Sequence, residues 1–245
     1  YAASGSGRGV DLNNDVIAAS GTVSMSGQHN TGATYAISLS GSTSITAGTG
    51  VTLESLNDNT GTIALLSSGG IDGGSGTVLM RAANYAFGGA DRTITTTGVL
   101  TIEPDADENS FASSFDNQYL NPVSVTGLTL GKSSNASAIT LSRAISLSGP
   151  VSIYGGSIDV NANITANSGN ILLDADTGST LNQSSTGILL DDAITIETVT
   201  SGNLTLIGRS GDTGSGFDGI DASSANTTTL RSAGNLTLQG YSYAA

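Results

Sequence analysis

The chain has 245 residues, of which glycine, serine, threonine and asparagine make up nearly half, whereas charged residues make up 11% and aromatic residues 4%. Cysteine is absent and histidine occurs once, which excludes a disulfide framework, thiolate metal sites, cysteine nucleophiles and multi-histidine metal centres. The formal net charge of -13 excludes nucleic acids and anionic membrane surfaces as partners, because each requires a basic surface.

No apolar run approaches the roughly 20 residues that a membrane helix needs, so we expect no membrane insertion by this segment. The first residues, Tyr1-Ala-Ala-Ser-Gly5, have neither the basic start nor the apolar core of a signal peptide. We therefore expect the chain to be an internal segment of a longer polypeptide.

A short phrase recurs along the chain, a glycine followed by apolar residues at alternate positions. Alternation with a period of two residues is typical of β-strands that bury one face. Successive phrases start 20 to 33 residues apart, which suits one coil of a β-solenoid. The phrases begin at Gly21, Gly50, Gly76, Gly98, Gly127, Gly149, Gly169, Gly202 and Gly234.

Shorter alternating runs lie between these phrases and predict further strands in each coil. Glycine interrupts every stretch that has helical apolar spacing, so no helix is expected. The sequence therefore predicts an all-β fold, a parallel β-solenoid of about nine coils. The shorter runs are residues 35–39, 139–141, 145–147, 158–160 and 194–196, and the phrase at Gly61 is assigned to an internal strand of its coil.

The alternative all-β arrangement is a pair of immunoglobulin-like sandwiches of about 120 residues each. The absence of tryptophan and the short repeat favour the solenoid. Equivalent residues of successive coils stack about 4.8 Å apart, so like charges would face each other, whereas serine, threonine and asparagine can form hydrogen-bonded ladders. Asn203 and Asn235, in the two copies of Gly-Asn-Leu-Thr-Leu, are predicted to form such a ladder.

We expect residues 1–245 to form a single continuous solenoid segment with neither end capped. The chain begins Tyr1-Ala-Ala3 and finishes Tyr243-Ala-Ala245, as one element cut twice would, which predicts a repeating unit of 242 residues. Open strand edges pair with other chains. The predicted partners are therefore copies of the same unit end to end, in tandem within one polypeptide or as a filament of separate chains.

Residues 103–122 hold five of the 20 acidic residues and three of the 11 aromatic residues, and they are predicted to form a loop excursion from the coil. One interpretation is a calcium-stiffened loop, since carboxylates are calcium ligands, although the spacing is not that of an EF-hand. The favoured interpretation is a solvated acidic loop folded over the solenoid by its aromatic side chains. The candidate ligands are Glu103, Asp105, Asp107 and Glu108.

Asp218 and Asp221 are weaker calcium candidates. They lie in residues 213–221, which fit the nonapeptide calcium β-roll pattern at all but its first glycine. Sites of that kind are shared between consecutive repeats, and here the motif stands alone, so turn glycines with surface aspartates are favoured. No cofactor is therefore assigned, and calcium remains the alternative.

Right-handed β-helices also include polysaccharide-degrading enzymes, which makes paired carboxylates the catalytic candidates. The pairs are Asp191 with Asp192 and Asp174 with Asp176, and only the second pair could share a strand face. No lysine or arginine lies nearby in the sequence to act as a base or clamp, and His29 has no recognisable context. We therefore expect no catalytic residues and no enzymatic activity.

The Gly-Asn-Leu-Thr-Leu phrases and residues 127–165 resemble the filamentous-haemagglutinin-like adhesins, large repetitive bacterial surface exoproteins secreted by two-partner or autotransporter routes. The resemblance extends from about Gly9 to Gly240. It implies a right-handed parallel β-helix shaft, folded outside the cell, that serves adhesion, biofilm cohesion or display of a distal effector. No receptor-binding residues are implied by it.

We therefore expect a structural and adhesive shaft of an extracellular bacterial fibre or surface adhesin, located at the cell surface and without catalysis. Surface glycans or a host or cell-surface receptor are the expected further partners. One alternative is a carbohydrate-binding solenoid whose acidic segment, residues 103–121, makes the contact with or without calcium. The less favoured alternative is a polysaccharide-degrading β-helix.

Overall fold

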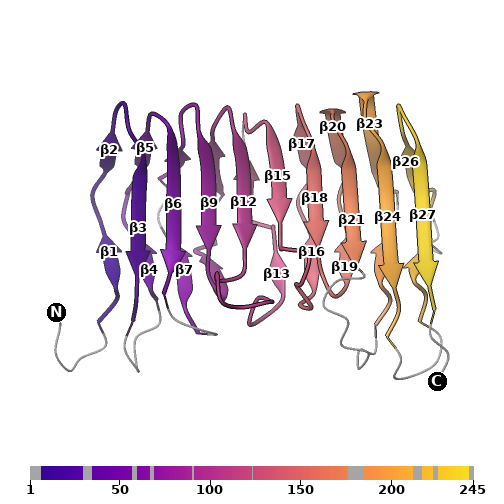
Figure 1. Cartoon of the computed structure of the whole chain (residues 1–245), viewed down its shortest axis with the longest axis horizontal. Helices are drawn as coiled ribbons and strands as arrows, with labels where there is room; N and C mark the ends of the chain where they lie inside the picture. Colours follow the sequence, from indigo (N-terminus) through magenta and orange to yellow (C-terminus); the bar gives the residue numbers. More distant parts are fainter. Residues whose placement is uncertain are drawn as a thin grey trace. The chain divides into compact units, whose positions relative to one another are not determined.

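A computed structural model describes residues 7–29, 35–56, 60–66, 69–89, 91–122, 124–175, 185–191, 193–211, 217–222 and 226–242. Every regular element in these residues is a β-strand, and the strands pair in parallel between successive coils (Figure 1). The chain divides into two compact units, one of residues 1–113 and 119–126 and the other of residues 114–118 and 127–245. Each unit is described by itself below.

Three columns of stacked parallel strands build the first unit, and the chain visits them in turn. Column A contains β1 (Val10–Leu12), β4 (Ile37–Leu39), β7 (Thr62–Leu65) and β10 (Asn84–Phe87). Column B contains β2 (Val16–Ala18), β5 (Ile45–Ala47), β8 (Ile71–Asp72), β11 (Arg92–Thr95) and β14 (Leu120–Pro122). Column C contains β3 (Val23–Gly27), β6 (Gly50–Ser55), β9 (Thr77–Arg81) and β12 (Val99–Glu103).

The second unit also consists of three columns. Column D contains β13 (Phe115–Asp116), β16 (Ile139–Leu141), β19 (Ile158–Val160), β22 (Ile188–Leu190) and β25 (Ile220–Asp221). Column E contains β17 (Ile145–Leu147), β20 (Ile164–Ser168), β23 (Thr195–Ser201) and β26 (Thr229–Arg231). Column F contains β15 (Gly127–Leu130), β18 (Val151–Tyr154), β21 (Ile171–Ala175), β24 (Leu204–Arg209) and β27 (Leu236–Tyr241).

Within each unit the coil is right-handed. In Figure 1 the strands of columns C and F run down the near side, and the chain returns upward behind them as it advances from one coil to the next. A strand, its crossover and the next parallel strand adopt this hand in nearly all proteins, because the right-handed twist of the strands favours it. The predicted right-handed parallel β-helix is therefore confirmed, and the sandwich alternative is wrong.

All nine predicted phrases form strands of columns C and F, and the phrase at Gly61 forms the internal strand β7, as predicted. Residues that pair between successive coils of column F lie from 20 residues apart, as Val151 and Ile171 do, to 33 residues apart, as Ile171 and Leu204 do. The predicted coil length of 20 to 33 residues is thus confirmed. The spread arises because the connections between strands vary in length while the paired strands keep their register.

The core consists of aliphatic side chains that point into the coil from alternate strand positions. In β21, Ile171 and Leu173 are fully buried, whereas Leu172 and Asp174 between and after them are half-buried on the outer face. Each inward residue stacks on its equivalent in the next coil, as Ile171 does on Leu204. Because these rows are continuous, the apolar burial of each coil depends on its neighbours, as in other repeat proteins.

The last described coil leaves its inward leucines open to solvent. Leu236 and Leu238 occupy the same rows as Leu204 and Leu206 and pair with them residue for residue. Yet Leu236 is 47% exposed and Leu238 51% exposed, whereas Leu204 and Leu206 are fully buried. The difference arises because a coil covers each face of β24, while β27 is covered on one face only among the described residues.

Candidate functional site

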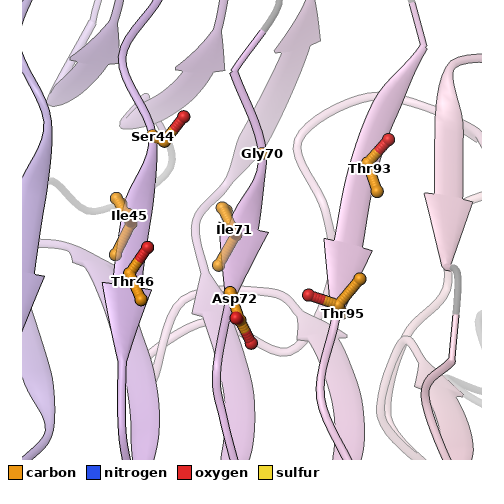
Figure 2. Close-up of a pocket in the computed structure, with 8 residues that line it drawn as sticks. All are labelled: Ser44, Ile45, Thr46, Gly70, Ile71, Asp72, Thr93 and Thr95. Atoms are coloured by element: carbon orange, nitrogen blue, oxygen red, sulfur yellow. The ribbon is translucent and has the colours of Figure 1, made fainter. Parts of the chain in front are cut away.

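A groove crosses the outer surface of column B, where β5, β8 and β11 lie side by side (Figure 2). Thr46 pairs with Asp72 and Asp72 with Thr95, so these three side chains form one row across the groove. Two positions before Asp72, between Ser44 and Thr93 of the neighbouring strands, Gly70 carries no side chain, which leaves a hollow beside this row. The groove is lined by Ser44, Ile45, Thr46, Gly70, Ile71, Asp72, Thr93 and Thr95.

The groove offers four hydroxyl groups and one carboxylate. Asp72 is exposed, and its Oδ1 accepts a hydrogen bond of 2.9 Å from the Gly74 backbone N–H. Hydroxyls and a carboxylate can bind water or the hydroxyl groups of a sugar. Hydrolysis of a glycosidic bond by the usual route requires two carboxyl groups, and the eight lining residues include one. The groove is therefore suited to contact with such hydroxylated groups.

Two of the four first predicted calcium ligands, Glu103 and Asp105, form hydrogen bonds within the protein. Glu103 Oε1 accepts a charge-assisted hydrogen bond of 2.5 Å from Arg81 Nε. Asp105 is buried, and its Oδ1 accepts a hydrogen bond of 2.7 Å from the Ala106 N–H. Asp107 is exposed and Glu108 is half-exposed. Within the described ranges, no three histidine, aspartate or glutamate side chains gather closely enough to hold a metal ion, so the structure does not bring these four together as a ligand set.

Residues 111–113 instead pack against β10, the last strand of column A, and the residue before it. The Phe111 ring is buried and meets the Tyr85 ring edge-on at 5.8 Å between centroids. The Ala112 N–H donates a hydrogen bond of 2.8 Å to Ala83 O. This packing agrees with the interpretation of a loop folded over the solenoid by an aromatic side chain. Residues 115–116 and 120–122 of the predicted excursion form the strands β13 and β14.

Tyr85, which contacts the Phe111 ring, is held in place by hydrogen bonds of its hydroxyl group. Its hydroxyl lies 2.8 Å from Met80 O and 2.9 Å from Glu103 O, within hydrogen-bonding reach of both. Burial raises the pKa of Tyr85 well above its ordinary value, and the negative charge of Glu103 raises the pKa further. The phenol therefore stays protonated and serves as a hydrogen-bond donor.

The second pair of calcium candidates lies in column D and the turn before it. Asp218 is exposed, and its carbonyl oxygen accepts a hydrogen bond of 3.0 Å from the Gly187 N–H. Asp221 ends β25, where it pairs with Leu189 of the preceding coil. Most of the glycine-rich part of the motif, residues 212–216, lies outside the described residues. In the described part, only Asp218 is an exposed aspartate before the strand, whereas Asp221 is a half-buried strand residue.

The predicted acidic pairs are only partly described. Asp174 is half-buried on β21, and burial raises the pKa of its carboxyl group. Asp191 is exposed after β22, and Asp176 and Asp192 lie outside the described residues. His29 is half-exposed, and its Nε2 lies 3.4 Å from the carbonyl oxygen of Thr60. None of these described groups forms part of the groove.

Asp159, on the outer face of β19, lies in an acidic environment that sequence reasoning missed. Thr140 separates it from Asp116 along column D. Burial raises the pKa of Asp159, and the charges of Asp191 and Asp116 raise it further, against the lowering effect of a 3.4 Å hydrogen bond from Asn161 Nδ2. The sequence contained one signal of this environment: Asp159 occupies an outward position of an alternating run, and Asp116 occupies the equivalent position two coils earlier.

Asp159→Asn is expected to raise the Tm slightly at about pH 7. A carboxyl group whose pKa is raised by folding destabilises the folded protein when it is ionised. The stability therefore falls as the pH rises from 3.8, the ordinary pKa of an aspartate, through the higher pKa of Asp159 in the folded protein. The gain should shrink as the pH is lowered towards 3.8, because Asp159 then loses its charge. Thermal melts of both proteins across this range check the effect, and a lower Tm for the variant at neutral pH would contradict it.

The predicted asparagine ladder is present on the outer surface of column F. Asn170 Oδ1 accepts a hydrogen bond of 2.9 Å from the Asn203 N–H, and Asn203 Oδ1 accepts one of 2.9 Å from the Asn235 N–H. Each side chain thus satisfies a backbone donor of the following coil at the start of a strand. The ladder holds the coils in register at the point where each phrase begins.

The chain matches no protein-family model, no curated protein and no solved structure. The described residues also contain no helix with the length and apolar character needed to cross a membrane. The coil, the groove and the open strand of the last coil are therefore the features from which a function can be inferred.

Proposed function

We propose that this chain is a structural and adhesive segment of an extracellular bacterial fibre or surface adhesin, similar to the filamentous-haemagglutinin-like adhesins, and that it has no catalytic activity. Copies of the unit continue end to end, in tandem within one polypeptide or as separate chains. The outer surface of this shaft makes the adhesive contacts, with surface glycans or a receptor on a cell as partners.

The observation that carries the proposal is the open row of leucines on β27. Leu236 and Leu238 are about half exposed, although the same residues one coil earlier are fully buried. Burying a leucine stabilises a protein by about 1.5–3 kcal/mol relative to leaving it exposed. A further coil stacked on β27 would bury both side chains and pair the free strand edge, so growth along the axis is favoured.

The distribution of polar groups supports contact over catalysis. Ser and Thr occupy outward positions in successive coils, as Ser152 and Thr129 do in column F. Leu172 follows them in this row and Thr205 and Thr237 come next, so the hydroxyls form two pairs, spaced about 4.8 Å within each pair, that can bind a hydroxylated ligand or another fibre. The groove over β5, β8 and β11 adds a hollow with one carboxylate to this surface.

Sedimentation velocity of the 245-residue chain over a range of concentrations tests the proposal. The wild type should form larger species reversibly as the concentration rises. Leu238→Lys should weaken the association about tenfold or more, because the burial of one leucine is lost and a charge is placed in an apolar row. Leu189→Lys is the matched control, since Leu189 is 40% exposed but points outward from column D, away from the open face.

The control variant should associate like the wild type. Wild-type chain that stays monomeric at every concentration would contradict end-to-end assembly. So would two lysine variants that weaken the association equally, because the open face would then have no special role.

A further inference from the structure

We infer that the open strand β27 of one copy pairs in parallel with the open strand β3 of a second copy in a single register, which places Leu236 on Val23 and Leu238 on Met25. The inference rests on the proposed function. It adds the surface that the second copy supplies and the alignment of the two strands at the junction.

The register follows from how the phrases stack inside each unit. Wherever two phrases pair, the first inward apolar residue of one phrase pairs with the first of the other, as Leu204 does with Leu236. The second inward residues pair in the same way, as Leu206 does with Leu238. The same holds at the other open strand, where Val23 pairs with Val51 and Met25 with Leu53. Val23 and Met25 are therefore the residues of β3 that continue the two inward rows of leucines.

A shift of one residue would destroy this match. Successive strand residues point to opposite faces, so such a shift would place Ser24 in the apolar row and expose a leucine. A shift of two residues would keep the faces but leave one inward leucine unpaired. Only the proposed register buries both leucines and keeps Thr237 beside Ser24 on the outer face.

The face of β3 has room for an incoming strand. Within the unit, a Cβ at Gly98 would collide with backbone atoms of Gly76 in the preceding coil, because consecutive coils are closely packed there. Gly234 is similarly crowded by Gly202 and Asn203. At Gly21, which precedes β3, a Cβ would meet nothing within 4 Å. Among the described residues, nothing occupies the space in front of β3 that the preceding coil fills elsewhere.

Neither strand carries the usual protection against edge pairing. Natural edge strands are blunted by charged residues, proline or bulges. β27 (Leu236–Tyr241) and β3 (Val23–Gly27) contain no charged residue and no proline. The repulsion between copies comes instead from the net charge of -13 spread over the chain, so association should strengthen as salt screens that charge.

The asparagine ladder can also continue across the junction, through the side chain of Asn235. Asn170 and Asn203 each accept the backbone N–H of the next phrase through Oδ1. Asn235 holds the equivalent position on the open coil. In the proposed register, Asn235 Oδ1 would receive the N–H of Thr22 from the second copy, which extends the ladder across the junction.

Single cysteine variants test the register, because the wild-type chain contains no cysteine. Thr237→Cys is mixed under oxidising conditions with a longer, tagged copy that carries Ser24→Cys or, as the matched control, Ser26→Cys. Ser24 and Ser26 are both exposed on the outer face of β3. Adjacent strands lie about 4.8 Å apart, within the Cα separation that a disulfide requires, whereas the control position lies about two residues further along.

We expect a mixed disulfide between Cys variants of Thr237 and Ser24, and at least a fivefold lower yield with the Ser26 variant. An equal or higher yield with the Ser26 variant would overturn the register and leave end-to-end assembly intact. Association in sedimentation without either mixed disulfide would overturn the pairing of β27 with β3. A chain that shows no association at all would overturn the proposed function together with this inference.

Discussion

Gly202→Ala should lower the stability of the second unit by about 3 kcal/mol or more, which corresponds to a fall in Tm of about 6 °C or more. Gly202 has a φ of +112°, a backbone conformation that residues with a side chain rarely adopt. A Cβ there would also collide with the carbonyl group of Gly169 in the preceding coil and approach Asn170 N to 3.1 Å. Both neighbours are backbone atoms of a paired coil, so neither can move without breaking the stack.

Gly21→Ala is the matched control, because Gly21 precedes the equivalent strand of the first described coil. A Cβ at Gly21 meets nothing within 4 Å. Alanine there should leave the Tm unchanged or raise it slightly, since it reduces the conformational freedom of the unfolded chain. Thermal melts of the two variants provide the measurement. If both variants lost the same stability, close contact between coils would not be the reason that glycine is required at position 202.

Leu206→Ala is expected to cost about 2–5 kcal/mol, the usual range for removing a fully buried leucine. Leu206 is fully buried in the inward row between Leu173 and Leu238. Its truncation leaves a cavity that both neighbouring coils border. Urea unfolding followed by circular dichroism, at a concentration where the chain is monomeric, measures the loss.

Leu238→Ala removes the same atoms from the same row and provides the comparison. Because Leu238 is 51% exposed, its truncation should cost less than half as much in the monomer. Under conditions that favour association, the cost of Leu238→Ala should rise as the side chain becomes buried. A monomer in which both variants lose the same stability would contradict the open face of the last coil.

The coil could be predicted from the sequence because its signal is local and repeated. Each phrase, such as residues 149–153 or 202–206, alternates apolar and polar residues over the length of one strand, and the burial of these strands follows that alternation. The alternation in one short strand is a weak signal, but its repetition in nine phrases makes the prediction of the coil secure. The asparagine ladder was predictable for the same reason, since Asn203 and Asn235 occupy the same place in identical phrases.

The environments of the acidic residues could not be predicted in the same way, because they depend on which residues meet between coils. Glu103 pairs with Arg81 of the preceding coil, 22 residues away in the sequence. The charges around Asp159 come from Asp191, after the paired strand of the following coil, and from Asp116, two coils earlier. Variable connection lengths hide these neighbours until the register of the strands is known.

The groove over column B also depends on register. Thr46, Asp72 and Thr95 are unremarkable in the sequence and form one row only because β5, β8 and β11 pair in line. The hollow beside them depends on the position of Gly70, which a sequence pattern reads as one more turn glycine.

Electron cryo-microscopy of the assembled chain tests the central claim most directly, that the unit is a shaft of stacked coils which continues end to end. The expected result is filaments of one width whose power spectra show a meridional layer line near 4.8 Å, because the strands then lie across the filament axis. Discrete particles of one size at all concentrations, or filaments in which the 4.8 Å spacing runs across the axis, would contradict the claim.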